Sequence, residues 1–169
     1  MHPRKIAAIE GLLRPSDKVL EFGTGPLAAW LAQHVAEVQT VEHRASWASK
    51  AIATAPQIVT FHWRRPSFPH HGMEPAQPNQ FTAYVHVPNQ LRMIFDAFLL
   101  NGRARIECAL NSAPWIRPGG WLFFHDWFPR RRYTKRLPTL QPFYDFREDL
   151  SVRDTPQTLA VFARRERAE

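Results

Sequence analysis

The sequence predicts an α/β protein with a single Rossmann-like, doubly wound sheet that is mainly parallel and carries an antiparallel strand at its C-terminal end. Short apolar runs alternate with stretches of helical periodicity along the chain. Such alternation is typical of a parallel sheet covered by helices on both faces. The second observation is size, because 169 residues correspond to about one domain. We therefore expect one domain over residues 1–169.

The N-terminal part alternates regularly between helices and strands. Apolar residues recur with helical spacing between residues 6 and 13, and Pro15 ends this first predicted helix. The next apolar run, 18–22, stops at Gly23 and indicates a strand buried on both faces. By the same criteria the sequence predicts strands at 38–42 and 58–63 and helices at 28–35 and 45–55.

The regular pattern stops between residues 64 and 89, a stretch with five prolines that predicts a long irregular segment. A loop of this length inside a compact domain is usually functional. The pattern then returns, with predicted strands at 94–100 and 121–126, a helix at 104–116 and, after an arginine-rich loop, two hairpin strands at 140–146 and 158–163.

Composition limits the classes of protein to which the chain can belong. Hydrophobic residues make up 44% of the chain, too many for a disordered protein. No apolar run approaches the roughly 20 residues that cross a bilayer, and the N-terminus lacks the pattern of a signal peptide, so we expect no membrane partner. The single cysteine, Cys108, cannot form an internal disulfide, which favours a cytoplasmic location.

Positive charge exceeds negative charge: the chain has 22 Lys and Arg residues against 15 Asp and Glu residues, a net charge of +7. Five of the basic residues fall between Arg130 and Arg136. This excess is compatible with an anionic partner but does not identify one, since solvated surface charge explains such clusters equally well.

A glycine turn between the first predicted strand and the following helix is the central feature of the sequence. Gly23 permits a tight turn there, and Gly25 lets a ligand approach the backbone closely. Glu42 lies about 20 residues further on, at the end of the next predicted strand, where a carboxylate can accept both hydroxyls of a ribose. The sequence therefore predicts a nucleotide-type cofactor.

Two cofactors fit this turn, NAD and S-adenosylmethionine. Glu21 lies directly under the turn, where a carboxylate would repel the pyrophosphate of NAD but would suit the ammonium of a methionine moiety. A dehydrogenase also normally needs a further substrate domain, for which 169 residues leave little room. Both considerations favour S-adenosylmethionine, with NAD as the alternative.

Several motifs then carry a resemblance to a known family. Residues 19–26 resemble motif I of class I methyltransferases, and residues 41–47 resemble the next motif. Residues 95–105 and 117–127 resemble a bacterial subgroup of methyltransferase-like proteins, which carries Asp-Gly-Arg after the fourth strand and His-Asp or Asp-Asp after the fifth. The resemblance extends from about residue 18 to residue 164 and implies an S-adenosylmethionine-dependent methyltransferase.

The resemblance also implies roles for individual residues. The methionine part of the cofactor would contact Glu21, Gly23, Thr24 and Gly25, the ribose would contact Glu42, and the adenine edge would contact His43 or His62. Asn101 is included among the cofactor-binding residues although the subgroup usually has aspartate there. An amide can hydrogen-bond but cannot act as a base, so cofactor binding is implied more strongly than catalysis.

The substrate side is predicted beyond the carboxyl ends of the fourth and fifth strands, where ligands of open α/β sheets bind. His125 and Asp126 are the candidates for a general base toward an acceptor hydroxyl. Packing of His125 in the strand, and pairing of Asp126 with an arginine, are the structural alternatives. Two basic groups border the same crevice and favour an anionic acceptor: Arg103 with Arg105, and Arg130, Arg131 and Arg132. The histidines lack a repeated ligand spacing, so we expect no metal site.

Three functions remain open from the sequence. The first is methyl transfer to an oxygen or nitrogen of a small or glycan-like anionic acceptor. The second is a cofactor-binding module with little catalysis, which the amide at Asn101 favours. The third is a nucleic-acid methyltransferase or binder, which the net charge favours; however, no tetrad such as Asn-Pro-Pro-Tyr follows the fourth predicted strand.

Overall fold

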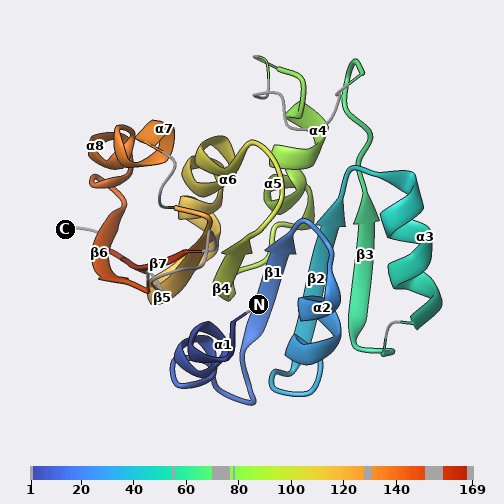
Figure 1. Ribbon diagram of the computed structural model, residues 1–169, viewed down its shortest axis with the longest axis horizontal. Helices are drawn as coiled ribbons and strands as arrows, with labels where there is room; N and C mark the ends of the chain where they lie inside the picture. Colours follow the sequence, from blue (N-terminus) through green and yellow to red (C-terminus); the bar gives the residue numbers. More distant parts are fainter. Residues whose placement is uncertain are drawn as a thin grey trace.

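Seven strands form one mixed sheet in the order β3-β2-β1-β4-β5-β7-β6 (Figure 1). A computed structural model of the chain describes residues 2–54, 56–69, 77, 79–127, 131–150 and 158–166. Strands β1 to β5 run parallel, and β7 runs antiparallel to both β5 and β6. The strands are β1 (Lys18–Phe22), β2 (Glu37–Glu42), β3 (Val59–Trp63), β4 (Phe95–Leu100), β5 (Ile116–His125), β6 (Tyr144–Asp149) and β7 (Leu159–Arg164). The predicted fold class is confirmed.

The helices cover the sheet in two layers. They are α1 (Pro3–Glu10), α2 (Pro26–Leu31), α3 (Ala45–Thr54), α4 (Thr82–Val85), α5 (Val87–Leu91), α6 (Arg105–Ser112), α7 (Arg131–Thr134) and α8 (Leu137–Leu140), with a 3₁₀ turn, η1, at Ala113–Trp115. None of the helices in the described ranges has the length and apolar composition of a bilayer-spanning segment.

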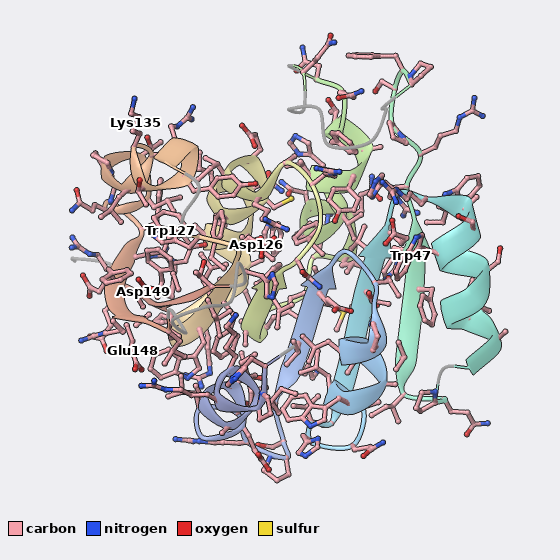
Figure 2. All side chains as sticks on the ribbon, in the orientation of Figure 1. Trp47, Asp126, Trp127, Lys135, Glu148 and Asp149 are labelled. Atoms are coloured by element: carbon pink, nitrogen blue, oxygen red, sulfur yellow. The ribbon has the colours of Figure 1, made fainter. Side chains whose placement is uncertain are left out.

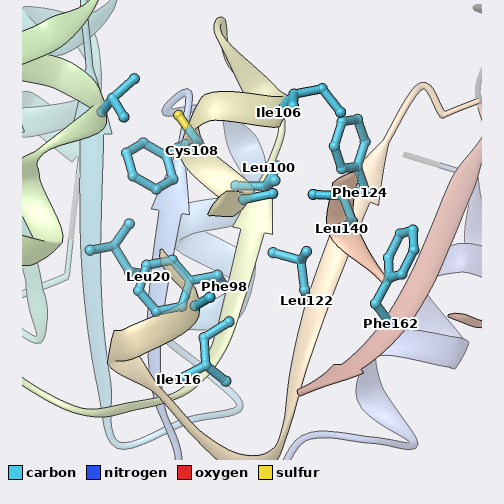
Figure 3. Packing of buried hydrophobic residues seen from close by; sticks show 14 of the residues in the cluster. Leu20, Phe98, Leu100, Ile106, Cys108, Ile116, Leu122, Phe124, Leu140 and Phe162 are labelled. Carbon is cyan, nitrogen blue, oxygen red and sulfur yellow. The ribbon is translucent and has the colours of Figure 1, made fainter. Parts of the chain in front are cut away.

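Two hydrophobic clusters lie on opposite faces of the sheet. One joins α1 and α2 to the face that carries Val19 and Leu99. The other joins α4, α5, α6 and α8 to the face that carries Leu20 and Phe98 (Figure 3). Because both faces of the central strands are covered, three of the five residues of β1 are apolar and buried. Its one buried acid, Glu21, is therefore placed at a cost to stability and needs an explanation.

The segment predicted as irregular, 64–89, contains a helix and the start of another. Helix α4 lies wholly within it, and α5 begins at Val87. The side chains of Tyr84 and Val87 are fully buried in the second cluster. Tertiary packing thus stabilises helical turns of only four and five residues, which are too short to be stable alone.

Three boundaries in the C-terminal part also differ from the prediction. Strand β5 begins five residues earlier than the expected 121, because the predicted turn at Pro118 lies within the strand, at an irregularity of the β4–β5 pairing. Helices α7 and α8 occupy part of the predicted arginine-rich loop, with Pro138 in the first turn of α8. Strand β6 consequently begins at Tyr144, later than the expected 140, but its antiparallel pairing with β7 is confirmed.

The turns that follow β1 and β4 are in direct backbone contact. A Cβ atom built on Gly23 would lie 2.5 Å from the Cα atom of Gly102, and Gly23 has a φ of 92°. A Cβ atom on Gly102 would in turn collide with the hydroxyl of Tyr84. The N–H of Asn101 donates to the carbonyl of Phe22 at 2.8 Å beside this contact. Both glycines are therefore required sterically, whatever ligand binds.

We expect Gly23→Ala to lower the free energy of unfolding by about 2 kcal/mol or more, because left-handed backbone at other residues costs about 1–3 kcal/mol and the methyl group would overlap Gly102. Urea denaturation measures this loss. Gly25→Ala is the matched control: Gly25 has φ −154° and a Cβ there meets nothing within 4 Å, so its effect should stay below about 0.5 kcal/mol. Equal losses in both variants would contradict this account.

Candidate functional site

The carboxyl ends of the parallel strands gather most of the predicted site residues at one edge of the sheet. Register places Glu21 of β1 beside Thr40 of β2 and Leu99 of β4. Because side chains alternate along a strand, Glu21 and Glu42 lie on the same face as Val19 and Val38, the face that α1 and α2 cover. The two carboxylates therefore face the same side of the crevice at adjacent strand ends.

Glu21 is fully buried and only partly satisfied by hydrogen bonds. The hydroxyl of Thr40 donates to Glu21 Oε2 at 3.1 Å, and the hydroxyl of Thr24 lies 2.6 Å from that of Thr40. Glu21 Oε1 has no hydrogen-bond partner among the described residues. Burial, opposed by the Thr40 hydrogen bond and aided by the charge of Glu42, raises the pKa of Glu21 to about 8. The carboxyl is thus mostly protonated at pH 7 and ready to ionise beside a cation.

The glycine turn leaves open space beside its second glycine. A Cβ atom on Gly25 would meet nothing within 4 Å, and its extended backbone suits any residue. The neighbouring Thr24 turns its buried hydroxyl toward Thr40, so that side chain supports Glu21 and does not line the open space. Atoms of a ligand could therefore approach the backbone at Gly25 without displacing protein.

Glu42 is an ionised carboxylate held in one orientation. Its Oε1 accepts the backbone N–H groups of His43 at 2.7 Å and Arg44 at 2.8 Å, and lies 2.9 Å from His43 Nδ1. Burial alone would raise the pKa of Glu42, but the hydrogen bonds from His43 and Arg44 outweigh burial and hold the pKa below its usual range. Among the described residues no hydrogen bond reaches Oε2, which leaves this oxygen available to a ligand hydroxyl.

A cavity of about 310 Å³ opens at the ends of β2 and β3 and is lined by His43, Arg44 and residues 65–69. It adjoins Glu42 through the chain and through the N–H of Arg64, which donates to the Glu42 carbonyl at 2.8 Å. Its volume lies at the lower end of ligand pockets, which span about 300–1,000 Å³. A flat ring with a small polar group would fit such a space.

Of the two histidines predicted at an adenine edge, the structure brings only His43 to this cavity. The ring of His43 packs edge-on against Phe81 and Tyr84. His62 lies beside Val41 in the β2–β3 register, on the face opposite Glu42, and its Nε2 is 2.6 Å from Gln39 Oε1. Burial, together with the charge of Arg64, lowers the pKa of His62. His62 is a packed strand residue, away from Glu42.

His125 and Asp126 lie at the end of β5 as one unit with a third residue, Arg105. Asp126 Oδ1 lies 3.0 Å from His125 Nδ1, and Arg105 donates to Asp126 Oδ2 at 3.2 Å. Asp126 has a φ of 55°, and its N–H donates to the carbonyl of Thr158 at 2.7 Å. Both carboxylate oxygens of Asp126 therefore lie within 3.2 Å of a basic side chain, and His125, with its side chain 9% exposed, is the more deeply buried of the two candidate bases.

Arg105 connects three parts of the crevice. Besides Asp126, its guanidinium donates to the carbonyl of Asn101 at 3.1 Å and lies 5.8 Å from the ring centre of Tyr133 in α7. The sequence placed Arg105 beside the crevice with Arg103 and gave an arginine as the alternative partner of Asp126, which is confirmed; it did not identify Arg105 as that arginine. The signal was present, since Arg105 ends the stretch that resembles the bacterial subgroup, but only the structure distinguishes it from the neighbouring Arg103.

The remaining predicted residues are placed as follows. Asn101 continues β4 and fastens it to β1 by its backbone N–H. Arg103 is half-buried on the turn before α6, and its carbonyl accepts the thiol of Cys108 at 3.6 Å. Arg131 begins α7, whereas Arg130 lies outside the described residues. No group of three His, Cys, Asp or Glu side chains that could hold a metal ion occurs in the described ranges.

Comparison with known protein families gave no match, and neither did comparison with curated protein sequences. Solved structures do resemble the chain. A methyltransferase-like protein from Silicibacter pomeroyi has 23% identity and a TM-score of 0.67 over 98% of this chain and 87% of its own.

Two further solved structures show the same likeness. The N-methyltransferase NodS from Bradyrhizobium japonicum, in complex with S-adenosyl-L-homocysteine, has 15% identity and a TM-score of 0.63 over 96% of this chain and 87% of its own. An rRNA methylase from Streptococcus thermophilus has 11% identity and a TM-score of 0.65 over 98% of both chains. Together with the strand order, these likenesses show that the chain has the fold of class I S-adenosylmethionine-dependent methyltransferases.

Proposed function

We propose that this protein binds S-adenosylmethionine and transfers its methyl group to an oxygen or nitrogen of an acceptor. The observation that carries the proposal is the carboxylate of Glu42, which is ionised and held in one orientation by the N–H groups of His43 and Arg44. Its second oxygen has no hydrogen bond among the described residues. Glu42 directly precedes His43, which lines the cavity. Such a carboxylate at the end of the second strand suits the two hydroxyls of a ribose. The complex of NodS with S-adenosyl-L-homocysteine supports the same choice of cofactor.

The residues present fit the whole cofactor. The buried Oε1 of Glu21 lacks a donor among the described residues, and the ammonium of the methionine part would supply one. The open space at Gly25 would admit the chain that joins ammonium to sulfonium. His43 and residues 65–69 would enclose the nucleobase. When bound, S-adenosylmethionine supplies an electrophilic methyl group on a positively charged sulfur.

The chain's own contribution to catalysis lies at the end of β5. His125 would take the proton of the acceptor hydroxyl or amine through Nε2 as the new bond to carbon forms. Asp126 would orient the ring from Nδ1, and Arg105 would hold Asp126 in place. Asn101 would contribute hydrogen bonds but no base. Alignment of acceptor and methyl group is the main requirement of such a displacement.

The acceptor class is the finer part of the proposal. Arg103 adds positive charge beside the crevice, whereas the charge of Arg105 is paired with Asp126; the charge of Arg103 supports a small or glycan-like acceptor with an anionic group. The structural neighbours include both NodS and an rRNA methylase, so fold likeness leaves nucleic acid as the rival class. The second candidate function, a binding module with little catalysis, is favoured by the amide at Asn101 and by the deep burial of His125.

The first test is loss of cofactor affinity in Glu42→Gln. This variant keeps the shape of the side chain but removes its charge, and charged hydrogen bonds are worth about 1.5–3 kcal/mol, so the affinity for S-adenosylhomocysteine should fall by about 10- to 100-fold. Calorimetric titration measures it. The matched control is Glu37→Gln, at the opposite end of the same strand, where Glu37 contacts Lys18 and Gln39. Tight binding of NAD by the wild type, with no binding of S-adenosylhomocysteine, would overturn the proposal.

The second test is proton release on binding. At pH 7 the Glu21 carboxyl, with its pKa near 8, holds a proton that a ligand ammonium would displace. Affinity should therefore rise with pH up to about 8 and then level off, with release of about one proton per ligand at pH 7. Titrations of S-adenosylhomocysteine in two buffers of different ionisation enthalpy measure the release. Glu21→Gln should abolish it, and a wild type that releases no proton would remove Glu21 from the ammonium site.

A further inference from the structure

An exposed group of aromatic and basic side chains surrounds the outer side of the cavity. It consists of Arg44, Trp47, Trp63, Arg65 and Phe68, and we call it the aromatic corner. The indole residues Trp47 and Trp63 are 47% and 49% exposed, and Phe68 is 38% exposed. Figure 2 shows Trp47 at the carboxyl end of the sheet, beside α3. So much exposed aromatic surface in one place is unusual for a protein surface that meets only water.

The fold brings these residues together from three segments. Trp63 ends β3 and pairs in register with Glu42, on the face that α3 covers. Trp47 lies in the first turn of α3, where its N–H donates to the carbonyl of Arg44 at 3.2 Å. Phe68 shares the wall of the cavity with Arg44. The corner is thus the outer rim of the carboxyl ends of β2 and β3.

Within the described part of the chain, the two indoles have no aromatic ring contact and the two guanidinium groups have no ion pair. Neither indole is in ring contact with another aromatic side chain, in contrast to Trp127, which packs against Phe124 and Phe162. The guanidinium groups of Arg44 and Arg65 have no hydrogen-bond or ion-pair partner among the described residues. These side chains contribute little to the core.

The charge around the corner is strongly one-sided. Residues 43–95 include five Lys and Arg residues and a single acidic residue, Glu74. Some arginines elsewhere are paired with acids: Arg117 lies 2.6 Å from Asp96, and Arg165 lies 2.7 Å from Asp145. Arg44 and Arg65 therefore add positive charge at the corner, next to the single carboxylate of Glu42, and this excess favours an anionic partner.

We propose that the aromatic corner binds single-stranded nucleic acid. Unpaired bases would stack on the faces of Trp47, Trp63 and Phe68, while phosphates would pair with Arg44 and Arg65. Stacking needs bases with exposed faces, which a duplex does not offer. A second copy of the chain fits less well, because a two-fold interface would bring the same unpaired arginines of both copies together.

The position of the corner connects it with the crevice. It borders Glu42 at one end of the carboxyl edge, and Lys135 lies beyond β5 toward the other end (Figure 2). A strand held at the corner could continue along this edge and present a base or ribose to His125. Nucleic acid would then replace the small acceptor proposed above as the methyl acceptor. That step rests on the proposed methyl transfer, whereas binding at the corner does not.

The test is fluorescence anisotropy of a labelled 12-nucleotide oligo(U) with the full chain, without cofactor. Loss of one stacked base should weaken binding by about 5- to 150-fold, so Trp47→Ala and Trp63→Ala should each do so. Arg44→Gln combined with Arg65→Gln should make the slope of log affinity against log salt shallower by about 1.4, at about 0.7 per phosphate. The matched controls, Phe146→Ala and Arg147→Gln, change exposed residues of β6 at the opposite edge of the sheet and should leave binding unchanged.

Several results would overturn this inference. The first is that the wild type does not bind oligo(U) at about 50 mM salt, a low concentration chosen because salt weakens such complexes. The second is that the β6 controls lose as much affinity as the tryptophan variants. The third is that a duplex binds as tightly as oligo(U). The fourth is binding to anionic vesicles without binding to oligo(U). If Trp47→Ala and Trp63→Ala weaken S-adenosylhomocysteine as much as oligo(U), the rings belong to the cofactor site and the inference is wrong. A wild type that binds oligo(U) but not S-adenosylhomocysteine would instead overturn only the proposed function.

Discussion

The backbone contact between Gly23 and Gly102 is the constraint on which the rest of the site depends. It joins the turn after β1 to the turn after β4, with Asn101 hydrogen-bonded to Phe22 beside it and the Gly23 N–H donated to the Val41 carbonyl. The ends of three neighbouring strands are thereby held in a fixed relation. Glu21 and Glu42 can then share one crevice, although 20 residues of chain, including helix α2, lie between them.

Most of the fold was predictable because its local and long-range preferences agree. The strand at 18–22 was predicted to the residue, since its apolar residues face both sides of the sheet and a glycine follows it. The prediction failed where packing overrides local preference: α4 and α5 form around the buried Tyr84 and Val87 despite the surrounding prolines. It also failed at Pro118, because proline and glycine occur both in turns and at irregularities of strand pairing, so the sequence cannot distinguish the two.

The site divides in the same way. The spacing of Glu42 from the glycine turn follows from strand and helix lengths, so it could be predicted, and the structure places that carboxylate at the crevice. His62 and His43 cannot be distinguished by position in the sequence, because the face on which each lies depends on register. The connection of Arg105 with Asp126 and Tyr133 was likewise out of reach, since it joins segments 21 and 28 residues apart.

The contact between the two glycine turns has a consequence for how such a protein can change over time. The backbone atoms of Gly23 and Gly102 touch each other at the base of the crevice. Nearly every substitution of these two glycines would therefore cause a steric clash, so this part of the crevice cannot change shape by mutation. Residues 65–69, which line the cavity, are partly or fully exposed at the surface of the molecule. Substitutions in residues 65–69 could therefore change which molecules the crevice accepts without moving the two glycine turns. The contact between Gly23 and Gly102 would stay constant over time, whereas ligand specificity could change.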